Sequence, residues 1–352
     1  MSWSSVLGHE ELAARFREAL ARGRQAHAYL FAGPEGIGKA LFARELAKAL
    51  QCEAGGPEPC DACRACRKVE HGNHPDVAFI RRVDEGDTGH SRSQILVDQV
   101  RQEIQEPIAY KPFEGRHKVF VVADAERMTQ EAQNCLLKTL EEPPPHSLLI
   151  LTAARLEPFV DTVVSRCRVV RFRPLPLQTV ERILVERADV DLADARVLGR
   201  LSGGSPGRAL RYREEGACET VLWLLRELAS LAPAGEFALA GDLLDAVREQ
   251  GAPLEAARQR LRLVLDLLTL AWRDVLFRRC GYARELLAWE PEPEELAAAG
   301  GGLSAEQARH MVDACLEARD QVDANANIKL LLEKLLLDTR ARLEGREPVV
   351  TR

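Results

Sequence analysis

A short apolar run followed by a glycine-rich loop and a helical pattern lies near the N-terminus. The run Ala28–Ala32 leads directly into Gly33-Pro34-Glu35-Gly36-Ile37-Gly38-Lys39-Ala40. Seven of these eight positions satisfy the phosphate-binding pattern G-x-x-x-x-G-K-[ST], in the strand–loop–helix order that it requires. Such glycines let backbone N–H groups converge on phosphate oxygens, and the lysine reaches the outer phosphates. The sequence therefore predicts a phosphate-binding loop (P-loop) with Gly33, Gly36, Gly38 and Lys39 as binding residues.

More strand-like runs follow within residues 1–173. They are short, apolar and bounded by polar or turn residues: Val77–Ile80, Val119–Ala123, Leu148–Thr152 and the more alternating Val169–Phe172. Runs of this length are typical of buried strands, and the segments between them are long enough for crossover helices. We expect an α/β domain with a mostly parallel sheet.

From Pro174 onward the pattern is helical, and we find no convincing strand. Residues 174–214 predict a small domain of about three short helices, and residues 215–352 predict a longer, leucine-rich helical domain. Its dense leucine indicates helices buried on a wide face, in a bundle or against a neighbouring subunit.

The predicted P-loop lacks groups that hydrolysis needs. Ala40 has no hydroxyl to coordinate magnesium, and Ala125 follows Asp124 where a water-orienting glutamate would stand. Asp124 fits a magnesium-binding acid at the end of a strand, although a helix N-cap is an alternative. Glu126 would point away from Ala125 along an extended chain. The site should hydrolyse ATP poorly, and the residues do not decide whether ATP or ADP occupies it.

Composition limits the partners and the location. The formal charge of −6 leaves no basic excess for gripping nucleic acid alone, although a basic face could exist within an acidic total. The N-terminus lacks a signal-peptide pattern, and no apolar run approaches the roughly 18 residues of a membrane span. We expect a cytoplasmic protein with no membrane association.

Four of the nine cysteines form a cluster, Cys52, Cys60, Cys63 and Cys66. Thiols stay reduced in the cytosol, so a metal is favoured over disulfides, and four thiolates can close a tetrahedral zinc site. With four protein ligands the zinc would be structural. An iron–sulfur cluster is the rival interpretation.

Several ordered fragments resemble the clamp-loader branch of the AAA+ family, and within it the bacterial delta-prime type. They are His27–Phe31, the P-loop, the cysteine cluster, His74–Asp76, Asp124–Met128, Asn134–Pro145 and Ser165–Cys167. The resemblance covers residues 3–215 and, more faintly, the helical remainder. It implies an AAA+ domain (1–173) with an inserted zinc module (52–66), a helical lid (174–214) and a helical collar (215–352).

The resemblance also implies roles for particular residues. Arg166, in Ser165-Arg166-Cys167, corresponds to an arginine finger that enters a neighbouring subunit's ATP site. Gly207 stands where motor subunits carry a lid arginine, so no phosphate-sensing role is assigned to Arg208. Thr152 lies near the polar sensor position at a strand end.

Three hypotheses follow. The first is a stator: a subunit that completes a heteropentamer with gamma/tau and delta subunits, donates Arg166 and helps load a sliding clamp onto primed DNA. The second is an ATP-hydrolysing motor subunit, which Ala40 and Ala125 oppose. The third is a zinc-dependent nucleic-acid module, which the lack of aromatic residues between the cysteines opposes.

Overall fold

The structure, a computed structural model, describes residues 2–81, 94–232, 234–248 and 252–346. The chain divides into two compact units. The first comprises Met1–Ile183 with Gly204–Gly207, and the second comprises Leu184–Gly203 with Arg208–Arg352. The boundary passes through a helix within the expected lid, and the division into three domains stays a prediction.

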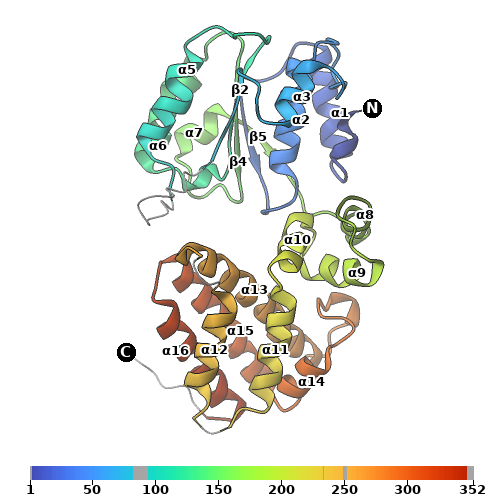
Figure 1. Ribbon diagram of the computed structural model, residues 1–352, viewed down its shortest axis with the longest axis vertical. Coiled ribbons are helices and arrows are strands. Elements are labelled where there is room, and N and C mark those ends of the chain that lie inside the picture. Colours follow the sequence, from blue (N-terminus) through green and yellow to red (C-terminus); the bar gives the residue numbers. More distant parts are fainter. Residues whose placement is uncertain (1, 82–93, 233, 249–251, 347–352) are drawn as a thin grey trace. The chain divides into compact units, whose positions relative to one another are not determined.

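The first unit is an α/β domain (Figure 1). Its helices and strands, in chain order, are η1 (Ser2–Ser5), α1 (Glu10–Ala21), β1 (Ala28–Ala32), α2 (Lys39–Gln51), α3 (Arg64–Glu70), β2 (Val77–Ile80), α4 (Val97–Val100), η2 (Arg101–Gln105), α5 (Glu106–Ile108), β3 (Lys118–Val122), η3 (Ala125–Arg127), α6 (Gln130–Glu141), β4 (Ser147–Ala153), α7 (Asp161–Arg166), β5 (Arg168–Arg171) and the start of α8 (Leu177–Ala188).

The five strands form one parallel sheet in the order β2-β3-β4-β1-β5. All five strands expected from the sequence are present within one residue of their expected ends, which confirms the α/β prediction. The parallel arrangement places the carboxyl ends of all strands at one edge of the sheet, where the loop after β1 begins. The strand β5 is an edge strand, because it pairs with β1 alone.

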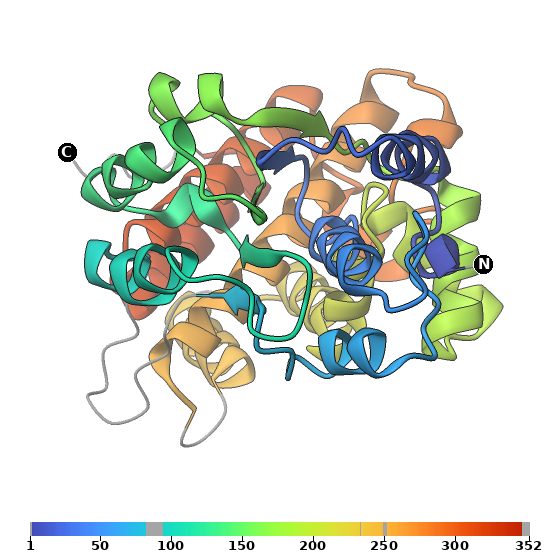
Figure 2. The ribbon, with the colours of Figure 1, turned by 90° about the horizontal axis from the view of Figure 1, so that it is seen from above.

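Helices cover both faces of this sheet. In Figure 1, α1, α2 and α3 lie on one side and α5, α6 and α7 on the other, and Figure 2 shows the same two layers from above. The alternation of strand side chains supplies both cores: Tyr29 and Phe31 of β1 face one layer, and Ala28 and Leu30 face the other.

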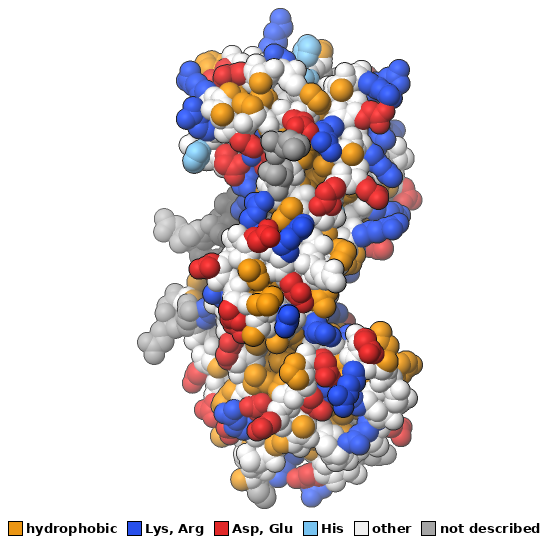
Figure 3. All heavy atoms as spheres, turned by 90° about the vertical axis from the view of Figure 1, so that its right-hand side faces the viewer, with side chains coloured by type: hydrophobic (Ala, Val, Ile, Leu, Met, Phe, Trp, Pro, Cys, Tyr) orange, Lys and Arg blue, Asp and Glu red, His pale blue; other side chains and the backbone are white. Residues whose placement is uncertain are grey.

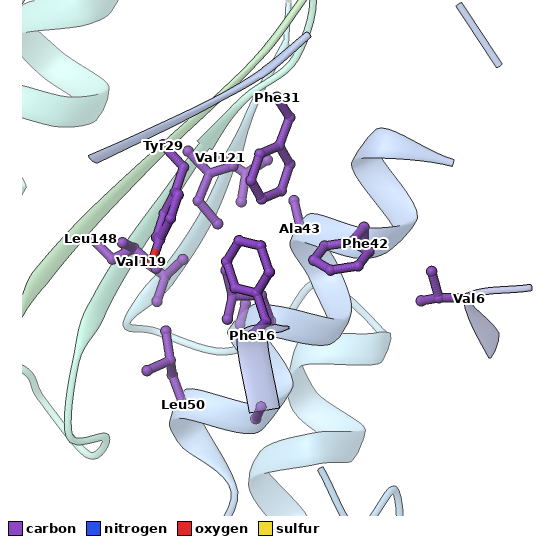
Figure 4. Packing of buried hydrophobic residues seen from close by; sticks show 14 of the residues in the cluster. Val6, Phe16, Tyr29, Phe31, Phe42, Ala43, Leu50, Val119, Val121 and Leu148 are labelled. Atoms are coloured by element: carbon purple, nitrogen blue, oxygen red, sulfur yellow. The ribbon is translucent and has the colours of Figure 1, made fainter. Parts of the chain in front are cut away.

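An aromatic cluster joins β1 to the helices of the first layer (Figure 4). Phe16 of α1 packs edge-on against Phe42 of α2 with ring centroids 5.1 Å apart, and Phe31 lies 5.7 Å from Phe42. Burying large aromatic side chains contributes a major part of core stability. This packing fixes α2, and with it the loop that precedes α2, against the sheet.

The second unit is helical throughout its described residues. Its elements are the end of α8, α9 (Leu192–Leu201), α10 (Pro206–Glu214), α11 (Ala217–Ala229), α12 (Glu236–Val247), α13 (Leu254–Arg279), η4 (Arg284–Leu286), α14 (Glu294–Gly300), α15 (Ala305–Asp323) and α16 (Ile328–Leu343). The helices α13 and α15 pack closely, and α12 packs against α16. The buried leucines of α13 and α16 line this bundle, as the leucine-rich pattern predicts.

No helix in the described ranges is both long and apolar enough to span a bilayer. The surface charge is mixed: on the face drawn in Figure 3, Lys and Arg side chains alternate with Asp and Glu. That face carries no broad basic patch of the kind that grips nucleic acid without other contacts.

Candidate functional site

The P-loop connects β1 to α2 at the carboxyl edge of the sheet. Gly33 donates its N–H to the carbonyl of Ala153 in β4 (3.1 Å), so the loop starts against two strands. A Cβ at Gly33 would lie 2.3 Å from the carbonyl oxygen of Phe172, and Gly38 adopts φ +98° as the residue before α2. Both positions therefore require glycine, as the predicted motif implies.

Lys39 is buried within this loop. Its Nζ donates to the carbonyl oxygens of Gly33 (2.6 Å) and Pro34 (2.7 Å). Burial lowers the pKa of Lys39, and the charges of Glu126 and Asp124 oppose this shift. The loop itself thus accepts hydrogen bonds from two of the three N–H donors of the ammonium.

A second segment, residues 204–207, lies against the P-loop. Ser205 donates its hydroxyl to the carbonyl of Glu35 (2.7 Å), and the N–H of Gly207 donates to the carbonyl of Gly36 (2.9 Å). A Cβ at Gly207 would lie 2.8 Å from the Cα of Gly36. An arginine at position 207 is thus incompatible with this contact, which agrees with its absence from the sequence.

His9 also contacts the loop. Its Nε2 lies 2.8 Å from the carbonyl oxygen of Ile37, and its ring packs edge-on against Phe172. Burial lowers the pKa of His9, so the ring is held neutral and donates Nε2–H to this carbonyl. No sequence pattern pointed to this residue, which lies directly before the first helix.

The residues after β3 do not continue as an extended chain. Asp124 has φ +50° and precedes the short helix η3, which places Ala125 in the core and Glu126 near Lys39. Glu126 accepts the N–H of Ala154 (2.9 Å), and burial raises its pKa. The backbone here is a turn and not the extended chain assumed for Glu126, and both Asp124 and Glu126 act electrostatically on Lys39. Thr152 is buried in β4, paired in register with Phe31.

Arg166 ends α7 and lies at the opposite edge of the sheet from the P-loop. The strand β5 starts two residues later, at Arg168, and Arg168 pairs with Tyr29 near the start of the parallel strand β1. Arg166 therefore lies at the amino-terminal edge of the sheet. The Arg166 side chain forms an ion pair with Glu141 of α6 (Nη2 to Oε1, 2.7 Å) and donates to the carbonyl of Thr162 (3.1 Å). Glu141 belongs to the motif Asn134–Pro145, so this motif and Ser165–Cys167 meet here.

The four clustered cysteines converge between α2 and α3. Their sulfur atoms all lie within 4.8 Å of one another, which is compatible with a metal ion whose four Zn–S bonds are each about 2.3 Å. The N–H groups of Cys60, Cys63 and Cys66 point at the sulfurs of Cys52, Cys60 and Cys63, at 3.3–3.4 Å. Donation from the Cys63 N–H lowers the pKa of Cys60 to about 7, while burial raises the pKa of Cys66. The donor set fits structural zinc, which requires thiolates.

Comparisons with known proteins identify relatives of this chain. The protein family described as "DNA polymerase III, delta subunit" matches residues 8–176. The DNA polymerase III subunit delta' of Bacillus subtilis is 29% identical over 319 residues, covering 91% of this chain and 92% of that protein. The gamma/tau subunit of Mycobacterium bovis is 35% identical over 256 residues, 70% of this chain, but the chain spans only 43% of that protein. A gamma subunit-related protein of Thermotoga maritima has a similar structure with TM-score 0.47, 20% identity and coverage of 93% and 99% of the two chains.

Proposed function

Because this chain belongs to the delta-prime family of DNA polymerase III clamp-loader subunits, we propose that it is the stator of such a clamp loader. In this role it joins gamma/tau and delta subunits in a hetero-oligomeric ring, a heteropentamer, and helps load the sliding clamp onto primed DNA. It donates Arg166 to the ATP site of a neighbouring motor subunit.

The position of Arg166 carries this proposal. A side chain at the opposite edge of the sheet from the chain's own P-loop cannot serve that loop, which supports a role in a site on another subunit. The pair with Glu141 is half-exposed, and surface ion pairs contribute about 1 kcal/mol or less. Arg166 can therefore leave Glu141 for a phosphate at little energetic expense.

The chain's own nucleotide site supports a stator more than a motor. Ala40 supplies no magnesium ligand, and the Lys39 ammonium is bonded to loop carbonyls. A motor role is the second candidate, since Asp124 and Glu126 lie near Lys39 and could assist a magnesium ion. Magnesium-dependent phosphate release by the isolated chain, abolished in Lys39→Ala, would favour the motor.

The cysteine cluster (Cys52, Cys60, Cys63, Cys66) would hold one zinc ion with a purely structural role. Four thiolate ligands leave no open position for water, so the metal would stabilise the connection between α2 and α3 and take no part in phosphate chemistry.

The decisive experiment replaces Arg166 with Ala in a complex reconstituted with the motor and delta subunits. An arginine finger contributes on the order of 10³-fold or more to the rate of the site that it serves. Assembly should be normal, while the rate of ATP hydrolysis by the complex should fall only in part, because the other motor sites do not depend on Arg166. Arg166→Lys should restore little of the lost ATP hydrolysis rate, since an ammonium lacks the planar, forked donor geometry of a guanidinium.

Arg22→Ala is the matched control. Arg22 is also a surface arginine that pairs with a glutamate, Glu18, at 2.7 Å. A fully assembled Arg166→Ala complex that hydrolyses ATP and loads clamps like the Arg22→Ala complex would contradict the finger assignment.

A further inference from the structure

A groove of about 540 Å³ lies between α1 and the edge strand β5. Its lining includes four arginines, Arg15 from α1 and Arg168, Arg171 and Arg173 from β5 and the residues after it. The groove contains no residue of the P-loop or of the cysteine cluster, and Arg166 is not part of its lining. The proposed function leaves this groove without a role.

All four arginines are exposed, and within the described residues none of their guanidinium groups forms an ion pair or a side-chain hydrogen bond. Neighbouring arginines of α1 behave differently: Arg17 pairs with Glu58 (2.8 Å) and Arg22 pairs with Glu18 (2.7 Å). Unpaired cations that converge on one groove create a positive potential there, which favours an acidic ligand.

The backbone of β5 is also available along this groove. The N–H of Phe172 donates to the carbonyl of Ala32 in β1 (2.7 Å). Successive residues of a strand in a parallel sheet direct their backbone groups to opposite sides. The N–H and C=O groups of Val169, Arg171 and Arg173 therefore point away from β1, toward the open edge. An extended chain can bond to this edge as an added strand.

We propose that the groove binds an extended acidic segment of a partner protein, which adds to the sheet beside β5. Arg171 and Arg173 share a strand face with Val169, opposite to the face on which Val170 and Phe172 pack against α1. A partner strand with carboxylates at alternate positions would match the spacing of these two arginines, while Arg15 and Arg168 line the groove on the α1 side of the open edge. This inference does not depend on the stator role.

An extended peptide fits the groove better than nucleic acid does. The aromatic residues of the lining, Phe16 and Tyr29, are buried and offer no face on which bases could stack. A phosphate backbone also has no N–H donors to pair with the open carbonyls of β5. A peptide strand supplies both donors and acceptors.

The test uses the full chain and a labelled ten-residue peptide in which Glu alternates with Thr, measured by fluorescence anisotropy. Binding should weaken at least tenfold in Arg171→Glu/Arg173→Glu and less than threefold in Arg24→Glu/Arg196→Glu. The control pair changes the net charge equally on exposed arginines outside the groove. Thermal melts of both variants establish that they fold.

Two further probes separate the possible ligands. A peptide of equal charge with Pro at the central Thr positions should bind at least tenfold more weakly, because it lacks the N–H donors for β5. On peptide binding, hydrogen exchange should slow at the amides of Val169, Arg171 and Arg173. Undetectable peptide binding, equal binding of the Pro peptide, or protection of these amides by a 12-nucleotide single strand instead would each overturn the proposal. If the peptide does not bind, the exposed arginines would instead be explained as charges that prevent edge-to-edge aggregation of β5.

Discussion

The carboxylate of Asp76 is buried and accepts three backbone hydrogen bonds. Its oxygens receive the N–H groups of Phe113 (2.6 Å), Glu114 (2.9 Å) and Gly115 (2.7 Å). Burial alone would raise the pKa of Asp76, but the three donors together outweigh it and lower this pKa. The His74-Pro75-Asp76 motif is thereby explained as an anchor that holds the loop before β3.

We expect Asp76→Asn to destabilise the first unit by about 3 kcal/mol, because one charged acceptor that serves three donors becomes a neutral group. Since the pKa of Asp76 is depressed in the folded state, its stabilisation is present above the ordinary pKa of aspartate and disappears as the pH falls through the folded value. Urea unfolding from pH 7 to pH 3 should show the difference between wild type and variant shrinking with acidity. Asp98→Asn, at a carboxylate whose ion-pair partner among the described residues is the exposed Arg101, should change stability by less than 0.5 kcal/mol at pH 7. A constant difference across this pH range would contradict the anchor.

Residues of the candidate sites differ in how far a sequence can predict them. Lys39 and the P-loop glycines were predictable because motif spacing fixes their geometry. Ser205 and His9 were not, because their contacts with the carbonyls of Glu35 and Ile37 join distant segments through backbone oxygens, which leave no side-chain pattern. The proximity of Glu126 to Lys39 was not predictable either, because a left-handed Asp124 starts a turn that residue alternation does not describe.

At the scale of elements, α2 and α3 are joined by an ionic network beside the cysteine cluster. The buried Nζ of Lys48 in α2 contacts Glu45 (2.7 Å), Glu70 of α3 (2.8 Å) and Asp61 of the cysteine loop (2.9 Å). Burial alone would lower the pKa of Lys48, but these carboxylates raise it. The network and the cysteines therefore hold the same two helices together, so we expect loss of a metal from the cysteines to destabilise α3.

We expect elemental analysis to find one zinc per chain, lost in Cys63→Ser. The variant should also be less stable and should lose hydrogen-exchange protection across α3, because structural zinc contributes to folding free energy. Cys280→Ser is the control, since Cys280 is an exposed free thiol in the second unit. Iron with visible absorption, or the same zinc content in Cys63→Ser as in Cys280→Ser, would reject the zinc assignment.

The strands β1, β3 and β4 were predictable because each is a short apolar run that a parallel sheet buries on both faces. The structure of the segment between β2 and β3 was harder to predict. It folds as the short helices α4, η2 and α5, in which helical turns of different width follow one another. A 3.6-residue period cannot describe such a segment. The longer helices of the second unit, by contrast, were predictable from their leucine spacing.

At the scale of the whole molecule, the second unit keeps part of its leucine surface exposed. Leu330 is 63% exposed and Leu337 is 36% exposed, both on α16, and Phe237 of the adjacent α12 is 56% exposed. Leu330 and Leu337 are seven residues apart and so lie on one face of the helix. An apolar helix face of this kind is typical of a subunit interface.

We therefore expect this face of α16 to contact another subunit in the clamp loader that we propose. Leu330→Glu/Leu337→Glu should fold, because neither side chain lies in the core, yet its incorporation with gamma/tau and delta subunits should fall at least tenfold, since a charge in a desolvated apolar contact costs more than 1.4 kcal/mol. Size-exclusion chromatography of the mixed subunits measures this. Leu192→Glu is the control, because Leu192 is 52% exposed but lies on α9, away from α16 in the sequence and outside the leucine face. If the double variant assembles as fully as Leu192→Glu, the ring contacts of this chain lie elsewhere, and the exposed leucines of α16 need another explanation.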